Sequence, residues 1–344
     1  MSRHSAHRPP GIARLRRIGL VSVLLALSAA AQGPVGSLLV VETANHVAYV
    51  RDVADYSLLA TKPDRTTPVV PRNFDELVII GDIISVNGRR VKGTVVETGT
   101  FLALRPAPAP GQAIADITRG GMIEWYFEVL DEVGQRIGSI RVSGMSGGQA
   151  PPGQTRQIQQ ASYVVVGGNG AFLGVRGYMG LAVGPGSTQP RPASIAEDPA
   201  NRRLLGGGSL RQGIYIIPMF RPEVLITPTG PAVVHASDFS LVTTARPARA
   251  GEILTLFATG LGPTRPGVEP GQPFPAAPPQ VANSPIDVTV NGSPAEVLYA
   301  GGFPGSIDGY QVNFRLPSQL SPGSASLSVS AAWIAGPEVR IAVQ

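Results

Sequence analysis

Two pairs of polar side chains lie on strand-like segments of this sequence and could act on a small molecule. Glu124 and Tyr126 alternate with apolar residues, and so do Arg176 and Tyr178. Residues two apart in a β-strand share one face, so each pair projects to one side. A carboxylate and a guanidinium that met in a pocket would perturb each other's pKa values. The sequence leaves open whether they meet, and whether each pair lies in a polar interior or in solvent.

Familiar catalytic patterns are present only in part. Residues 144–148 fit G-x-S-x-G and His235 lies downstream, but Pro151 and Pro152 follow where that motif needs a helix. Residues 168–174 miss the dinucleotide-binding spacing by one position, and no helical pattern follows. We therefore assign no catalytic residue and expect no cofactor.

Metal ligands are too few and too scattered for a recognisable site. After the first 31 residues the histidines are His46 and His235, and the chain has no cysteine, so no zinc spacing exists. Asp64, Asp75 and Asp308 form no calcium loop. We expect no metal site.

The first 31 residues have the pattern of a secretory signal peptide. Five arginines precede the apolar run 18–27, and Ala29–Ala31 follow as small residues suited to cleavage. The run is shorter than the roughly 20 residues of a membrane span. These arginines account for the whole excess of 28 basic over 23 acidic residues, so the mature chain is formally neutral and nucleic acid is not expected as a partner. The sequence predicts a secreted or extracytoplasmic protein.

Composition predicts an all-β protein with two domains. The chain has 42 glycines and 33 prolines, placed between short alternating segments and not within long helical patterns. In residues 122–130 the apolar side chains take alternate positions, and a turn at 131–134 leads to a predicted partner strand at 138–144. We predict a barrel over 37–183, a Pro/Gly-rich linker over 184–212 and a C-terminal domain over 213–344.

The stretch 162–180 places closely spaced glycines between two β-branched runs. Gly167, Gly168 and Gly170 allow a tight corner between paired strands, since glycine adopts positive φ without strain. Together with residues 81–104 and 125–144, this stretch resembles the barrel of the allene oxide cyclase and dirigent-protein superfamily over about residues 75–183. That resemblance implies an antiparallel eight-stranded barrel, often trimeric, with an apolar pocket open at one end. Cyclase members close a fatty-acid epoxide into a ring, and dirigent members orient phenolic radicals or quinone methides.

The resemblance also implies a few binding residues. Arg176 and Tyr178 match the Arg-Gly-Tyr of dirigent proteins, where the cation can polarise a carbonyl or quinone oxygen. Asp82 matches a Gly-Asp of the cyclases, although a turn role explains it equally well. The chain departs from the cyclases because Thr100 and Phe101 stand where those proteins have a cysteine.

The C-terminal domain predicts a β-sandwich of immunoglobulin-like character. Alternating segments end at turn residues, including Asn291-Gly292, a strong hairpin signal. Over about residues 219–344 the sequence is similar to a C-terminal domain of secreted proteins from Acidobacteria, notably Solibacter relatives, which implies a surface or interaction module.

Three functions follow. The favoured one is a binding protein whose barrel holds or orients a small apolar or aromatic molecule, with Arg176, Tyr178, Glu124, Tyr126 and Asp82 as candidate binding residues. The alternatives are an isomerase or cyclase acting in the same pocket, and a structural or adhesive protein. A barrel filled by its own side chains would favour the last.

Overall fold

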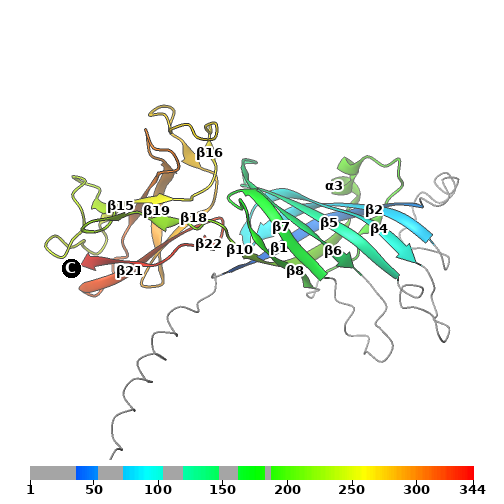
Figure 1. The fold of residues 1–344 in the computed structure, drawn as a ribbon, viewed down its shortest axis with the longest axis horizontal. Coiled ribbons are helices and arrows are strands. Elements are labelled where there is room, and N and C mark those ends of the chain that lie inside the picture. The colour runs from blue at the N-terminus through cyan, green and yellow to red at the C-terminus, as the bar shows by residue number, and fades with distance from the viewer. Residues whose placement is uncertain (1–35, 53–72, 104–118, 147–161, 183–186) are drawn as a thin grey trace, which may run out of the picture. The chain divides into compact units, whose positions relative to one another are not determined.

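The computed structural model describes residues 36–52, 73–103, 119–146, 162–182 and 187–344. The chain is all-β, as the composition predicts (Figure 1). The predicted signal peptide lies outside the described residues. In the described ranges, no helix is long and apolar enough to cross a membrane.

Eight antiparallel strands form a closed barrel, which confirms the first half of the predicted fold class. Their order around the barrel is β2-β4-β5-β6-β7-β8-β10-β1, and pairing of β1 with β2 closes it. The short strand β3 extends one hairpin. The bounds are β1 Ser37–Asp52, β2 Asn73–Val86, β3 Arg89–Arg90, β4 Lys92–Ala103, β5 Arg119–Leu130, β6 Arg136–Ser146, β7 Ser162–Gly170, β8 Arg176–Ala182 and β10 Gly208–Ile217.

Strand alternation decides which side chains face the barrel interior, or lumen. On β5 the four apolar residues Ile123, Trp125, Phe127 and Val129 are at most 3% exposed, which confirms the predicted phase of this strand. The turn at 131–134 joins β5 to β6 as predicted.

The glycine corner lies at the end of β7. Gly170 has φ +60°, and a Cβ there would approach the Ile137 carbonyl oxygen to 2.5 Å. A Cβ at Gly168 would lie 2.5 Å from the Phe172 carbonyl oxygen, whereas a Cβ at Gly167 would meet only the Arg176 guanidinium, at 3.5 Å. Two of the three predicted turn glycines are therefore required by close backbone approach.

The predicted boundary between barrel and linker needs correction. Strand β10 begins at Gly208, inside the predicted linker, and pairs with both β1 and β8. The rest of the described linker runs along the barrel through β9 (Arg191–Pro192), the 3-10 helix η3 (Pro199–Asn201) and α3 (Arg202–Leu205). Residues 208–217 are therefore the closing strand of the barrel, because without them β1 and β8 would have unpaired edges.

The C-terminal half forms a second, nearly closed sheet with its own apolar core. The alternating segments of this half form strands at 253–259, 286–290, 310–315, 323–331 and 339–343, and the predicted Asn291-Gly292 hairpin joins β18 to β19. The bounds are β11 Glu223–Val224, β12 Ile226–Thr227, β13 Gly230–Pro231, β14 Val233–His235, β15 Ile253–Thr259, β16 Thr264–Arg265, β17 Val281–Ala282, β18 Ile286–Val290, β19 Ser293–Gly302, β20 Tyr310–Arg315, β21 Gly323–Ala331, β22 Ile334–Ala335 and β23 Val339–Val343.

Candidate functional site

The predicted pair on β5 lies on the outer face of the barrel. Glu124 is exposed and forms an ion pair with Arg141 of β6 at 3.7 Å. Tyr126 is half-buried on the same face, opposite Arg141 in the strand register. Neither side chain faces the lumen, because the inward positions of β5 are the apolar ones.

The predicted pair on β8 is also outside. The Arg176 guanidinium is exposed and donates to the Val175 carbonyl oxygen at 3.1 Å. Tyr178 is 61% exposed and stacks on Tyr215, with ring centroids 5.1 Å apart. Of the two positions left open for this pair, interior or solvent, both residues take the solvent one, and the structure does not bring them close to Glu124.

Asp82 fixes the segment that follows β9 to the outer wall. Its carboxylate accepts hydrogen bonds from Arg202 at 2.6 Å, Arg203 at 2.8 Å and Asn45 at 3.0 Å. Burial alone would raise the pKa of Asp82, but these hydrogen bonds outweigh it and the pKa lies below its usual value. With its acceptor sites occupied by the chain, Asp82 has a structural role.

The lumen itself is largely apolar. Trp125 stacks on Phe127 at 5.8 Å and meets the edge of Tyr163 at 6.2 Å. On the side formed by β6, β7 and β8, the inward side chains Val142, Val165 and Met179 are buried. These residues belong to the barrel core, and they fill much of the interior.

Glu97 is the exception among the inward residues of β4. It is opposite Ile79 on β2 and Trp125 on β5, and both neighbours face the lumen. The side chain is 8% exposed, and its carboxyl forms no hydrogen bond or ion pair with any described residue. Burial raises the pKa of Glu97 to about 8, so the group is a neutral carboxylic acid at neutral pH.

The indole of Trp125 adds a second unpaired donor next to this acid. Trp125 is 3% exposed and its Nε1–H has no partner within the described chain. Residues directly opposite on antiparallel strands have Cβ atoms about 5 Å apart. The carboxylic acid and the indole N–H are therefore neighbouring donors on one wall of the lumen.

His46 enters the lumen through a bulge in β1. The register of β1 shifts between Ala44 and Val47, and a Cβ at the inward-facing Gly81 would meet the His46 ring at 2.6 Å. The Thr43 hydroxyl donates to the Leu210 carbonyl oxygen, so it accepts from His46 Nε2–H at 2.7 Å.

This geometry leaves His46 Nδ1 as a buried acceptor with no partner among the described residues. Burial lowers the pKa of His46 to about 4, an effect that Asp82 partly offsets, so the ring is neutral.

Gln212 completes the set from the closing strand. It lies between the inward residues Leu210 and Ile214 on β10 and is fully buried. Both atoms of its amide lack a hydrogen-bond partner in the part of the chain that the structure describes. Gln212 can therefore both donate and accept.

These four residues form what we call the polar arc: Trp125, Glu97, His46 and Gln212. They come from β5, β4, β1 and β10, and the one strand between them, β2, contributes Gly81 beneath the imidazole. Leaving a buried polar atom unpaired costs about 1–3 kcal/mol. Four such atoms, His46 Nδ1, Trp125 Nε1 and both amide atoms of Gln212, together with the buried Glu97 carboxyl, are the arrangement expected where water or a ligand completes the hydrogen bonds.

Sequence reasoning missed the polar arc. Glu97 follows Val95-Val96, where either valine could face inward, so alternation does not fix its direction. His46 lies at a bulge, and Gln212 lies beside the predicted linker. A usable signal is the polar residue between Leu210 and Ile214 in an otherwise alternating strand.

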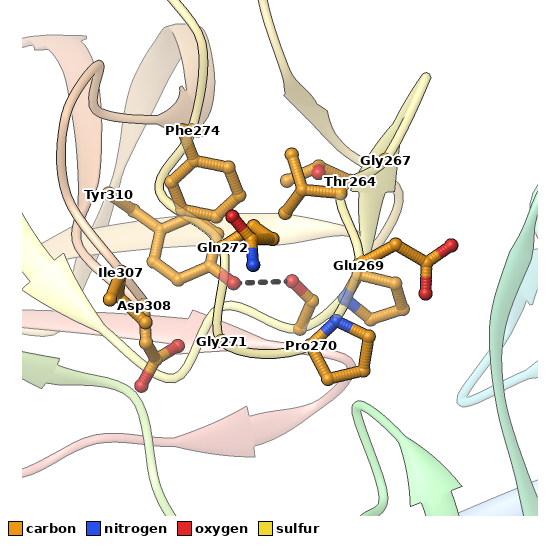
Figure 2. Close-up of a pocket in the computed structure, with 13 residues that line it drawn as sticks. Thr264, Gly267, Glu269, Pro270, Gly271, Gln272, Phe274, Ile307, Asp308 and Tyr310 are labelled. Carbon is orange, nitrogen blue, oxygen red and sulfur yellow. Dashed lines mark hydrogen bonds between the residues drawn. The ribbon is translucent and has the colours of Figure 1, made fainter.

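A hollow of about 250 Å³ in the C-terminal half is less suited to a ligand (Figure 2). Its aromatic lining residues Phe274 and Tyr310 are almost fully buried, and Tyr310 donates to the Gly262 carbonyl oxygen at 2.7 Å. Asp308 has φ +56°, and burial raises its pKa. These contacts tie the 260–263 turn to β20, which indicates a structural corner.

A second hollow, of about 500 Å³, surrounds His235. His235 Nδ1 lies 2.6 Å from Glu252 Oε1 and its Nε2 lies 3.3 Å from the Arg246 carbonyl oxygen. Both ring nitrogens therefore lie against acceptors of the chain itself. These contacts give His235 a structural role in this half.

A third hollow, of about 410 Å³, lies on the outer wall of β1 and β2. Val78, Ile80 and Ile195 form its apolar floor. Its charged groups are paired, Arg51 with Glu76 and Arg191 with Glu197. Among its lining residues, Tyr49 has a buried hydroxyl without a partner in the described chain, which is fewer unsatisfied groups than in the lumen.

Comparisons with known proteins identify no family. No protein-family model matches the chain, and no curated protein sequence matches it. One solved structure, named as a polysaccharide lyase, is similar at 10% identity and a TM-score of 0.18, over 90% of this chain and 40% of its own. A similarity this low carries no argument about fold or activity.

Proposed function

We propose that this protein binds a small, mostly apolar molecule inside its barrel. The observation that carries the proposal is the polar arc, because buried groups without partners in a lumen otherwise lined by apolar residues are typical of ligand sites. The side formed by β6, β7 and β8, with Val142 and Val165, is apolar. The described side chains already fill part of the barrel, so the ligand is small.

The site differs from the one predicted by resemblance. Arg176 and Tyr178 point outward, so binding in the lumen depends on Glu97, Trp125, His46 and Gln212 instead. Membership of the cyclase and dirigent superfamily remains our proposal for the barrel. We also propose that the C-terminal half is immunoglobulin-like and acts as a surface or interaction module, and that the first 31 residues direct export of the protein.

Titration with the neutral fluorophore N-phenyl-1-naphthylamine tests binding in the lumen. We expect saturable enhancement of its emission with the full-length protein. Val165→Trp, which adds volume to the lumen, should abolish it. Val164→Trp, on the exposed face of the same strand, should not.

Two results would contradict the proposal. One is no saturable binding to the wild type. The other is undiminished binding by a Val165→Trp variant whose circular dichroism is native. If that variant does not fold, native mass spectrometry of the wild type is the alternative test. A mass above that of the chain would show a retained small molecule and support the proposal, and the mass of the chain alone would contradict it.

The alternative favoured by a packed interior is a structural protein. It predicts that trapped water alone completes the hydrogen bonds of the polar arc. The same titration separates the two, since a purely structural barrel would not bind the fluorophore.

A further inference from the structure

The hollow on the outer wall of β1 and β2 has an apolar floor that stays partly open to solvent. On β2 the lining residues Val78 and Ile80 lie two apart on one face, and Val78 is 36% exposed. Ile195, on the segment that follows β9, lines the same hollow and is 48% exposed. The space of about 410 Å³ that these side chains border lies in the size range of small-molecule sites.

The segment after β9 forms one wall of this hollow, and the chain holds it at both ends. Ala193 donates its backbone N–H to the Ala48 carbonyl oxygen of β1 at 2.9 Å. Further along the segment, the two arginines of α3 bond to the carboxylate of Asp82 on β2. Ile195 lies between these two anchors, so the hollow is part of the folded chain and needs no ligand to form.

The charged residues at the hollow are paired with one another. Arg51 pairs with Glu76 across β1 and β2. Both carboxylate oxygens of Glu197 accept from Arg191, at 2.6 and 3.0 Å. Each pair is neutral as a unit, so an ionic ligand would lose hydration over the apolar floor without gaining an unmatched counter-charge from the lining residues.

From the volume, the aliphatic floor and the paired charges, we infer that this hollow binds a small, neutral, apolar molecule at a site separate from the barrel lumen. Contact with Val78, Ile80 and Ile195 supplies the affinity, because it removes their exposed apolar surface from water. The site lies on the other side of the barrel wall from the lumen, since Val78 and Ile80 alternate with the buried, inward Ile79. It therefore does not depend on the proposed function.

Isoleucine methyl groups report on both sites in one NMR experiment. Ile80 and Ile195 line the hollow, whereas Ile123, Ile140 and Ile214 belong to the barrel core. The full-length protein, labelled at its isoleucine methyl groups, is titrated at neutral pH with benzyl alcohol, benzoate or benzylammonium. These three probes share one aromatic ring and differ in charge. N-phenyl-1-naphthylamine does not report on the hollow, because its emission rises only where water is excluded.

We expect benzyl alcohol to shift the Ile80 and Ile195 methyl signals in a saturable way. Each ion should bind there roughly tenfold more weakly, because the lining charges are already matched. Shifts of the core isoleucines would report on the proposed function separately. If they stay unchanged while Ile80 and Ile195 respond, the hollow binds its ligand and the lumen does not.

The variant Ile195→Asp gives a result that loss of folding cannot imitate. A carboxylate added to the floor should weaken binding of benzyl alcohol severalfold and make benzylammonium the tighter ligand, as read at the Ile80 methyl. Leu204→Asp is the matched control, since Leu204 is 84% exposed on the same segment and is not a lining residue of the hollow. This control should bind all three probes as the wild type does.

Any of three results would overturn the inference. The first is the absence of shifts at Ile80 and Ile195 with benzyl alcohol. The second is binding of either ion at the hollow as tightly as the alcohol. The third is a pair of variants, Ile195→Asp and Leu204→Asp, that bind the three probes alike.

Discussion

At the scale of single residues, the candidate binding residues in the structure are buried polar groups and not the exposed charges that the sequence patterns indicated. The exposed pairs that sequence patterns favoured already have partners in solvent or on the wall, as with Glu124 and Arg141. Glu97 and Gln212 have none among the described residues, and both are buried. Burying a polar group without a hydrogen-bond partner lowers the stability of the fold. Such residues are expected at functional sites, because an apolar side chain would pack better in the same position.

Glu97 should make stability depend on pH in the alkaline direction. Its pKa is raised from 4.5 to about 8, so the folded state binds this proton more tightly than the unfolded state. The stabilising contribution is full below about pH 4.5 and is lost as pH rises through 8, at up to about 1.4 kcal/mol per pH unit. Urea unfolding of wild type and Glu97→Gln between pH 5 and 9 measures this.

Glu97→Gln should flatten the fall in the free energy of unfolding across that range, and Glu124→Gln should not. His46 acts in the opposite direction, because its lowered pKa costs stability as pH falls from 6.5 through about 4. A wild-type profile with the same slope as Glu97→Gln would show that the carboxyl is not desolvated.

Gly81 should be intolerant of any side chain. A Cβ would lie 2.6 Å from the His46 ring, which is held by the Thr43 hydroxyl and cannot move freely. Gly81→Ala should destabilise the protein by about 1–3 kcal/mol. Gly180→Ala, an outward strand position with open space, is the control and should have little effect in the same thermal unfolding experiment.

At the scale of elements, alternation predicted a strand well where the apolar period was unambiguous. The hairpin β5–β6 and the strands β15, β18 and β20 follow their sequence patterns. Alternation failed at two places with physical causes. A bulge shifts the phase of β1 near His46, and β10 starts in a glycine run that looks like a linker. Its partner β1 is far away in sequence, and such non-local pairing is not encoded in local periodicity.

The closing role of β10 predicts different behaviour for two truncations. A fragment of residues 36–217 retains all eight barrel strands, whereas 36–183 ends before β10 and leaves β1 and β8 with unpaired edges. The longer fragment should unfold cooperatively and give widely dispersed amide peaks by NMR, and the shorter one should aggregate. A folded 36–183 fragment would restore the original boundary.

At the scale of the whole molecule, composition and turn chemistry were enough to predict an all-β chain, whereas the closed eight-stranded barrel was predicted from the superfamily resemblance. They were not enough to locate the site, because the direction of each inward polar residue depends on register and closure. The protein combines a barrel that keeps polar groups unpaired in its interior with a second sheet that has a separate core. We therefore place function in the barrel and treat the C-terminal half as a module attached to it.

The central claim is that something other than the chain completes the hydrogen bonds of the polar arc. A high-resolution crystal structure of the full-length protein, with no added ligand, tests it most directly. We predict density for non-protein atoms within hydrogen-bond distance of the Glu97 carboxyl, Trp125 Nε1 and the Gln212 amide. Density extending over the Trp125–Phe127 stack would identify an organic molecule. A lumen in which the chain's own side chains pair all of these groups would contradict the account.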